Sequence, residues 1–180
     1  MFNLSQRARR SAAVPNGAST LSQPGNEAMF GSKSQTGLLI PGLAGFYATW
    51  SEISYALMRV IIGYILFMHG WGKVTGAGVA GISGYMAKQG LEPGVVFAMA
   101  AMFLETVGAL CVGIGLFTRF FAAALAIEMA IAFVFVHAPH GFAAGKGGFE
   151  YVLLLGIVLF AIAIRGGGRY SVDAQIGKEL

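Results

Sequence analysis

Three ionisable residues lie in stretches of the chain that are otherwise apolar, and they are the first candidates for chemistry. Glu105 and Glu128 each lie near the middle of an apolar segment, Val95–Phe117 and Phe120–Val136. Arg59 lies inside an earlier apolar segment. An acid at the centre of a membrane costs about 2.5–3.5 kcal/mol on insertion scales. Two such acids therefore require a compensating partner or a function.

Arg59 is the counter-charge that the sequence predicts for the two acids. Counting at ~1.5 Å per residue from the short connection at Thr118 and Arg119 places Glu105 and Glu128 within about 6 Å of each other in depth. One arginine balances one carboxylate, so we expect the other carboxyl to hold a proton near neutral pH. Such a group either joins helices through a hydrogen bond, or serves as a proton relay or as part of a quinone-headgroup site, and the sequence leaves these interpretations open.

A second set of polar residues is expected at one mouth of the protein. His69 and Lys73 end one apolar segment, His137 ends another, and Glu150 opens the last. Together they could bind a metal, shuttle protons or hold an anionic or quinone-like ligand, or they could simply be solvated or packing residues at the membrane interface. The proline between His137 and His140 rules out zincin-type spacing, and we predict no metal site.

The elements that must position these residues are membrane-spanning helices. A span needs about 20 mostly apolar residues, and the segments that contain Glu105 and Glu128 form a helical hairpin with a turn at Thr118 and Arg119. Residues 53–72 make a first span, and Phe149–Ile164 a fourth. The predicted fold class is an all-α, integral membrane four-helix bundle.

Four regions are expected along the chain. Residues 1–36 are polar with three early arginines, which is typical of a disordered basic tail. Residues 37–52 are apolar but short and contain Pro41, which favours an interfacial segment. Residues 53–168 hold the four transmembrane helices, and residues 169–180 form a polar C-terminal tail.

Composition supports the membrane assignment. The chain has 180 residues, of which 56% are hydrophobic and 11% are charged, whereas soluble domains average about 25% charged residues. The lipid bilayer is therefore the expected partner, and a net charge of +4 is too small to indicate nucleic-acid binding. Cys111 is the single cysteine, so redox chemistry would require a borrowed quinone, flavin or partner thiol.

Lysine and arginine are distributed unequally between the two predicted membrane faces. The face that carries both termini and the hairpin turn holds eight of them, and the opposite face holds three. The positive-inside rule therefore predicts cytoplasmic termini. The eight residues are Arg7, Arg9, Arg10, Lys33, Arg119, Arg165, Arg169 and Lys178.

The order of several short motifs resembles the DoxX family over about Ser51 to Asp173. These motifs are Arg59 with Gly63, His69-Gly70-x-x-Lys73, Pro93, Glu105-x-x-Gly108, Gly113-x-Gly115-Leu116-x-Thr118-Arg119, Met129, His137, Glu150, Gly166–Gly168 and Ser171-Val172-Asp173.

The resemblance implies a compact four-helix protein of the bacterial inner membrane. Family associations point to redox work, including a thiosulfate:quinone oxidoreductase subunit in archaea. In mycobacteria they include a membrane partner of superoxide dismutase and a sulfurtransferase.

The leading functional hypothesis is a redox-associated inner-membrane subunit, linked to a quinone or to a sulfur or thiol donor. Glu105, Glu128 and Arg59 would manage protons as the catalytic group, and His69, Lys73, His137 and Glu150 would bind the ligand. Two alternatives remain: a scaffold subunit that docks partner proteins without chemistry, and a small proton-coupled carrier. Whether the chain is an enzyme, and whether it forms a homo-oligomer, stay open at this point.

Overall fold

A computed structural model describes residues 37–179, and these residues contain helices and turns but no strand. The all-α prediction is therefore confirmed, whereas the predicted tail over residues 1–36 lies outside the described residues. Residues 40–180 belong to one compact unit. Its α-helices are α1 (Ala44–Thr75), α2 (Gly78–Lys88), α3 (Gly94–Phe103), α4 (Ala109–Ile114), α5 (Thr118–Ala132), α6 (Glu150–Arg165) and α7 (Val172–Ile176).

Five shorter helical turns complete the described chain. Two are π-helical: η2 joins α3 to α4, and η3 continues α5. Three are one-turn 3₁₀ helices, which precede α1, follow η3 and precede α6. Their bounds are η1 (Pro41–Leu43), η2 (Leu104–Gly108), η3 (Phe133–His137), η4 (Ala138–His140) and η5 (Ala144–Lys146).

Three helical stretches are long and apolar enough to cross a membrane: Pro41–Thr75, Gly94–Ile114 and Thr118–His140. The fourth predicted span corresponds to α6, which has 16 residues. At ~1.5 Å per residue it measures about 24 Å, less than the roughly 30 Å hydrocarbon core of a bilayer. The structure thus supports three candidate spans by length and apolarity.

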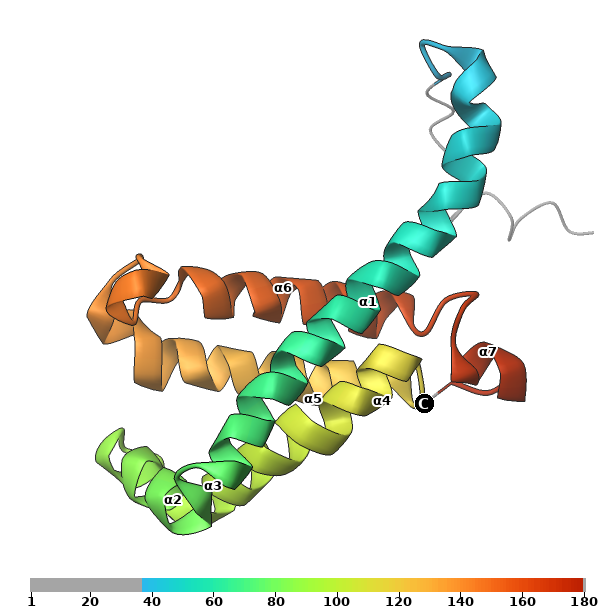
Figure 1. Cartoon of the computed structure of the whole chain (residues 1–180). Helices are drawn as coiled ribbons and strands as arrows, with labels where there is room; N and C mark the ends of the chain where they lie inside the picture. Colours follow the sequence, from blue (N-terminus) through green and yellow to red (C-terminus); the bar gives the residue numbers. More distant parts are fainter. Residues whose placement is uncertain (1–36, 180) are drawn as a thin grey trace, which may run out of the picture. The chain divides into compact units, whose positions relative to one another are not determined.

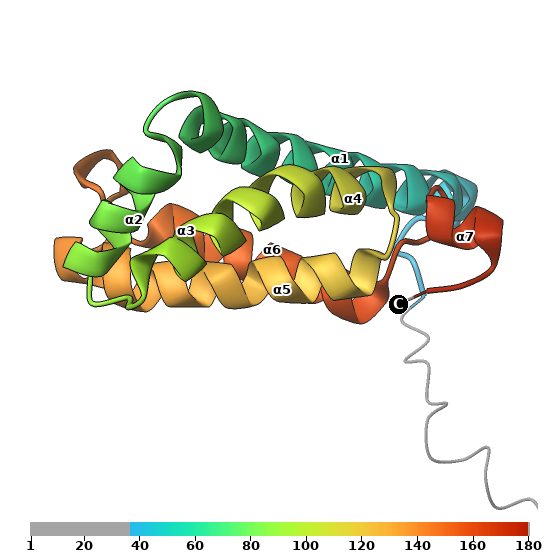
Figure 2. The same ribbon diagram turned by 90° about the horizontal axis from the view of Figure 1, so that it is seen from below.

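Two close pairs of helices enclose the core, and α2 packs against α3 as a third pair. α5 and α6 run side by side in opposite directions (Figure 1), and α1 lies along η2 and α4 (Figure 2). Between them lies an apolar core, to which α1, α4, α5 and α6 all contribute. Its fully buried side chains include Leu66, Val112, Leu125, Leu159 and Ile162.

Helix α1 runs without a break across the predicted boundary between residues 52 and 53. Pro41 lies in the η1 turn just before the helix, where a missing N–H costs no hydrogen bond. The predicted interfacial segment is therefore partly the first turns of α1, with Phe46, Tyr47 and Trp50 exposed there. At 32 residues, α1 is about 48 Å long and exceeds the thickness of a bilayer core.

The hairpin turn lies earlier than the sequence predicts. Helix α4 ends at Ile114, and the N–H groups of Gly115 and Leu116 bond back to the carbonyls of Val112 and Cys111, which is the Schellman pattern. Gly115 has a φ of 78°, a conformation that glycine adopts without steric cost. Thr118 and Arg119, predicted to form the turn, are instead the first residues of α5.

The segment after α6 is more structured than a polar tail. α7 places the buried Asp173 at the start of α5. The carboxylate of Asp173 accepts hydrogen bonds from the backbone N–H of Phe117 (2.8 Å) and of Thr118 (2.9 Å), and from the Thr118 hydroxyl (2.6 Å). Asp173 therefore caps the N-terminus of α5 from a distant part of the chain.

Candidate functional site

The buried acid Glu105 is paired with Lys73, which comes from the last turns of α1. The ammonium of Lys73 donates a hydrogen bond to Glu105 Oε2. The Glu105 side chain is 6% exposed and that of Lys73 is 27% exposed, so the pair spans from the protein interior toward its surface. Burial of a carboxylate is costly unless it is paired in this way.

Two local features bring α1 and Glu105 together. Glu105 lies in the π-helical turn η2, and such turns are frequent at functional sites. Gly70 of α1 packs directly on the Glu105 backbone, because a Cβ at Gly70 would lie 2.6 Å from the Glu105 carbonyl carbon. The absent side chain at Gly70 thus permits the close approach that places Lys73 over Glu105.

Glu128 reaches the same region from α5. It lines the same cavity as Glu105 and Lys73. Among the described residues, Glu128 Oε2 is the one buried side-chain nitrogen or oxygen atom without a hydrogen-bond partner. A buried unpaired polar atom costs about 1–3 kcal/mol, so this oxygen marks a position where a hydrogen-bonding group would be stabilised.

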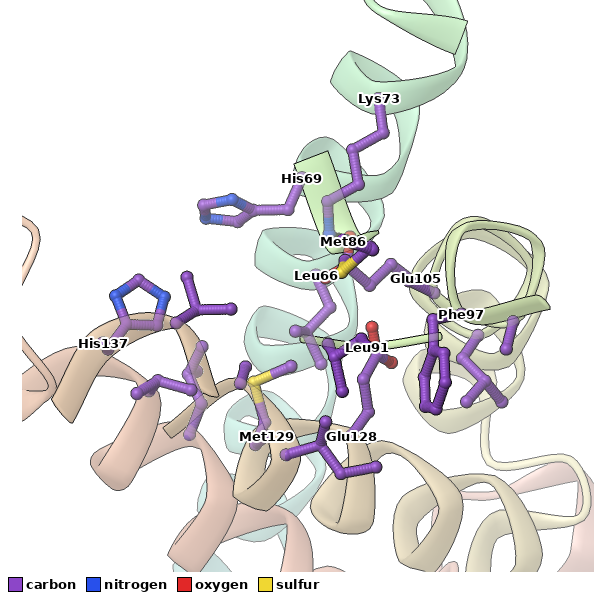
Figure 3. Close-up of a pocket in the computed structure, with 18 of the residues that line it drawn as sticks. Leu66, His69, Lys73, Met86, Leu91, Phe97, Glu105, Glu128, Met129 and His137 are labelled. Atoms are coloured by element: carbon purple, nitrogen blue, oxygen red, sulfur yellow. Dashed lines mark hydrogen bonds and ion pairs between the residues drawn. The ribbon is translucent and has the colours of Figure 1, made fainter. Parts of the chain in front are cut away.

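These residues line a cavity of about 530 Å³, which we call the Glu128 cavity. Figure 3 shows Glu105, Glu128 and Lys73 on one side of it and the imidazoles of His69 and His137 on the other. The remaining wall is mostly aliphatic, aromatic or thioether side chains from α1, α2, α3, α5 and α6 and from the connection between α2 and α3. Examples are Leu66, Met86, Leu91, Phe97, Met129 and Leu155.

Hydrogen bonding fixes the tautomer of neutral His137. Its Nδ1 lies 2.8 Å from the carbonyl oxygen of Gly147, and a carbonyl can only accept, so Nδ1 carries the hydrogen. Nε2 of the neutral ring is then free to accept a proton. His69 makes an aromatic contact with Tyr151, with 6.1 Å between the ring centroids.

The predicted outer cluster is only partly assembled. His69, Lys73 and His137 line the Glu128 cavity, but Glu150 does not. Glu150 Oε1 accepts a hydrogen bond from the backbone N–H of Ala144 at 2.8 Å. This bond holds the loop between η4 and α6 in place, because an ionised carboxylate accepts a strong, charge-assisted hydrogen bond from a backbone N–H.

The predicted pairing of Arg59 with Glu105 or Glu128 is wrong. The buried guanidinium donates to three carbonyl oxygens: Gly113 (3.4 Å), Tyr170 (2.6 Å) and Gly167. These carbonyls belong to the end of α4 and to the segment after α6. Arg59 and Lys73 are 14 residues apart, or about 21 Å along the helix. Arg59 therefore lies at the end of the helical unit opposite to Lys73 and Glu105.

Two participating residues were missed in the sequence. Tyr151 lines the cavity next to His69, and its position one residue after Glu150 was the available signal. Asp173 was noted within a motif, but its capping of α5 depends on a contact between residues far apart in the chain. Among the described residues, no group of three or more His, Cys, Asp or Glu side chains is arranged to hold a metal ion.

The charges around the cavity do not balance. Lys73 neutralises one carboxylate, so a pocket with Glu105 and Glu128 both ionised carries one net negative charge. Low-dielectric surroundings make such an excess charge costly. The arrangement is electrically neutral when it also holds one proton.

Comparison with known proteins supplies a family. The sequence model of the DoxX family matches residues 54–138. A Haemophilus influenzae protein named "Uncharacterized protein" is 29% identical over 132 residues, which cover 69% of this chain and 91% of that protein. The Bacillus subtilis "Putative oxidoreductase CatD" is 32% identical over 127 residues, which cover 71% of this chain and 90% of the relative. No solved structure matches the chain significantly.

Proposed function

This chain belongs to the DoxX family of membrane proteins, and from that premise we propose that it is a redox-associated subunit whose Glu128 cavity binds a quinone-type ligand. The observation that carries the proposal is an apolar cavity that holds an ion pair and an unpartnered carboxyl oxygen. The name of the Bacillus relative adds support for oxidoreductase chemistry.

The cavity suits a quinone headgroup in size and in lining. Its volume of about 530 Å³ falls within the roughly 300–1,000 Å³ of small-molecule sites. Apolar side chains surround a small number of polar groups, the usual pattern in which contacts with the ring give affinity and polar groups set its orientation. The cavity opens among helices that are long and apolar enough for a membrane, where quinones dissolve.

The polar residues match the proton requirement of this ligand class. A quinone takes up two electrons and two protons when it is reduced, and gives them up when it is oxidised. Lys73 and the imidazoles of His69 and His137 can donate hydrogen bonds to carbonyl oxygens. Glu128 Oε2 can accept a hydrogen bond from a ring hydroxyl, and the Lys73–Glu105 pair holds the neighbouring charge in place. We assign Arg59 a structural role.

Electrons must come from a partner protein. The chain has one cysteine, Cys111, so it cannot form an internal dithiol-disulfide couple. A soluble dehydrogenase or a sulfur- or thiol-oxidising enzyme docked to the membrane would supply them. The proposed location is the bacterial inner membrane, with α6 as a fourth span beside α5 and both termini in the cytoplasm.

Ligand extraction and titration test this proposal. The protein purified in mild detergent should release a quinone into organic solvent, detected by mass spectrometry. The quinone-stripped protein should then bind short-chain ubiquinone or menaquinone analogues. We expect Glu128→Gln to weaken that binding about tenfold, because an amide oxygen accepts a weaker hydrogen bond than a carboxylate and cannot take up a proton.

Glu52→Gln is the matched control, because it is the same chemical change at a surface acid that pairs with Arg165. It should leave affinity unchanged. A protein with no bound small molecule, but in a stable stoichiometric complex, would instead indicate a scaffold. Proton-driven solute uptake into liposomes would indicate a carrier.

A further inference from the structure

The buried polar side chains of the described residues fall into two groups at opposite ends of the helical unit. One group holds Glu105, together with Lys73 and Glu128. The other holds Arg59, Thr118, Ser171 and Asp173. Every other fully buried side chain in the described core is apolar. The two ends therefore differ in how a proton could reach Glu128.

Packing separates Glu128 from the end near Arg59, which we call the closed end. A groove of about 350 Å³ beside Arg59, between α1 and α4, shares no lining residue with the Glu128 cavity. Glu128 and Thr118 are ten residues apart on α5, which is about 15 Å along the helix. Buried aliphatic side chains fill this depth, including Ile62, Val112, Leu125, Leu159 and Ile162. Two titratable groups pack with them: the partly buried Cys111 thiol and the buried Tyr55 phenol, whose hydroxyl donates a hydrogen bond to the carbonyl of Gly166 (2.5 Å). The guanidinium of Arg59 donates its hydrogen bonds to backbone carbonyl oxygens.

At the other end, the exposure of the polar side chains increases stepwise from the interior to the surface. Glu128 Oε2 is buried, Glu105 is 6% exposed and Lys73 is 27% exposed, and His69 beyond them is exposed. The titratable and charged groups that face Glu128 around the cavity are His69, Lys73, Tyr85, Glu105, His137 and Tyr151. They come from α1, α2, η2, η3 and α6, and all of them lie toward this one end.

We infer that Glu128 exchanges its proton with one face of the membrane only, the face where α1 and η3 end and α6 begins. The O–H bond of Glu128 breaks as an O–H bond forms on Glu105, and the proton then passes to water at the exposed mouth beside Lys73 and His69. Lys73 keeps its own proton throughout and stabilises Glu105 as a carboxylate between transfers. This proton path does not depend on which ligand the cavity binds, because no step requires a quinone.

Labelling with dicyclohexylcarbodiimide tests the inference, because this membrane-permeant reagent modifies protonated carboxyls in apolar surroundings. Right-side-out and inverted vesicles from an expressing bacterium would be buffered inside at pH 6 and shifted outside to pH 9. Peptide mass spectrometry separates modification at Glu128 from that at Glu105. A Lys146→Cys variant treated with an impermeant maleimide identifies which vesicles present the Lys146 face to the medium.

The labelling rate at Glu128 should fall at least twofold after the shift only in vesicles that present the Lys146 face. Nigericin, which collapses the pH difference, should make both vesicle types respond. Three results would overturn the inference. The labelling rate could fall in the other vesicles only, or in both vesicle types without nigericin, or Glu128 could remain unlabelled under every condition. Quinone binding could fail while this result holds, because the labelling needs no quinone.

Variants test the relay through Glu105. Glu105→Gln keeps the shape of the side chain but removes the transferring carboxyl, so the response of Glu128 labelling to the pH shift should slow at least tenfold. Lys88→Met, on the exposed end of α2, should respond as the parent does. Equal rates in Glu105→Gln and the parent would show that the proton bypasses Glu105. Size-exclusion profiles and circular dichroism would establish that each variant is folded.

Discussion

The roles of individual charged residues are decided by their depth along the helices. Lys73, at the end of α1, neutralises Glu105. Arg59, about four turns earlier on the same helix, binds only backbone carbonyls among the described residues. The sequence predicted the opposite assignment, with Arg59 opposite the acids and Lys73 at a separate outer site. Helical periodicity identifies the face a residue occupies, but pairing also requires a matching height on the neighbouring helix.

Removal of Lys73 should destabilise the protein more than removal of a surface lysine. Lys73→Met leaves the buried Glu105 carboxylate without its partner. Because Lys73 is 27% exposed, water can compensate in part, and we expect a loss of about 2 kcal/mol, below the ~3–5 kcal/mol of fully buried pairs. The double variant Lys73→Met/Glu105→Gln should recover most of the loss.

Unfolding in detergent would measure both variants, with Lys88→Met as the control. Lys88 is exposed and forms no ion pair with any residue from 37 to 179. If Lys73→Met and Lys88→Met were equally stable, the Lys73–Glu105 pair would contribute nothing to folding.

Replacement of Arg59 should affect stability without affecting the cavity. Arg59→Leu removes the donors to the carbonyls of Gly113, Gly167 and Tyr170, and each buried unpaired carbonyl costs about 1–3 kcal/mol. Arg59→Lys should restore only part of the loss, because an ammonium cannot reproduce the planar fork of a guanidinium. The folded fraction of Arg59→Lys should bind quinone analogues as the parent does. A selective loss of binding would place Arg59 in the site after all.

At the scale of elements, close helix contacts determine how the Glu128 cavity is built. Gly63 of α1 packs against Ala109 and Gly113, and Gly70 packs against Glu105. The sequence predicted the apolar helices, because a helix that crosses a membrane follows from the length of an apolar segment. The π turns η2 and η3 and the cap of α5 by Asp173 could not be predicted, since they depend on contacts between distant segments.

Gly70 and Gly72 form a matched pair of test positions on α1. A Cβ at Gly70 would lie 2.6 Å from the Glu105 backbone, whereas one at Gly72 would meet no atom within 4 Å. Gly70→Ala should move α1 away from η2, separate Lys73 from Glu105 and weaken analogue binding. Gly72→Ala should stabilise the protein slightly, by about 0.5–1 kcal/mol, because alanine is the better helix former.

Unfolding curves and quinone-analogue titrations of the two alanine variants would check this contrast. If Gly70→Ala bound the analogues as tightly as Gly72→Ala, the close approach of α1 to η2 would not be needed for the site.

At the scale of the whole molecule, the two ends of the helical unit have different tasks. The end with Arg59, Thr118 and Asp173 secures helix termini through buried hydrogen bonds. The end with Lys73, Glu105 and Glu128 contains the cavity. Stability and proposed chemistry are thus separated by an apolar layer, which allows the second end to keep an unpartnered carboxyl without loss of the fold.

This division predicts a topology. The closed end, near Arg59, carries Arg119, Arg165 and Arg169, whereas the cavity end carries Lys88 and Lys146. The positive-inside rule therefore places the closed end in the cytoplasm. Reporter enzymes that are active only in the cytoplasm should be inactive when fused at Lys88 or at Lys146. Activity at either position would contradict four spans with cytoplasmic termini.

Photoaffinity labelling with an azido-quinone tests the central claim most directly, because it reports where a quinone binds in the intact protein. Crosslinks should fall in the peptides that contain Met86, Phe97 or Met129, which line the Glu128 cavity. An excess of unlabelled short-chain quinone should suppress them, and Glu128→Gln should reduce them about tenfold, in line with its predicted affinity. A quinone site in this cavity would be contradicted if the labelling fell on exposed residues of α6, such as Ile157 and Phe160, and no competitor suppressed it.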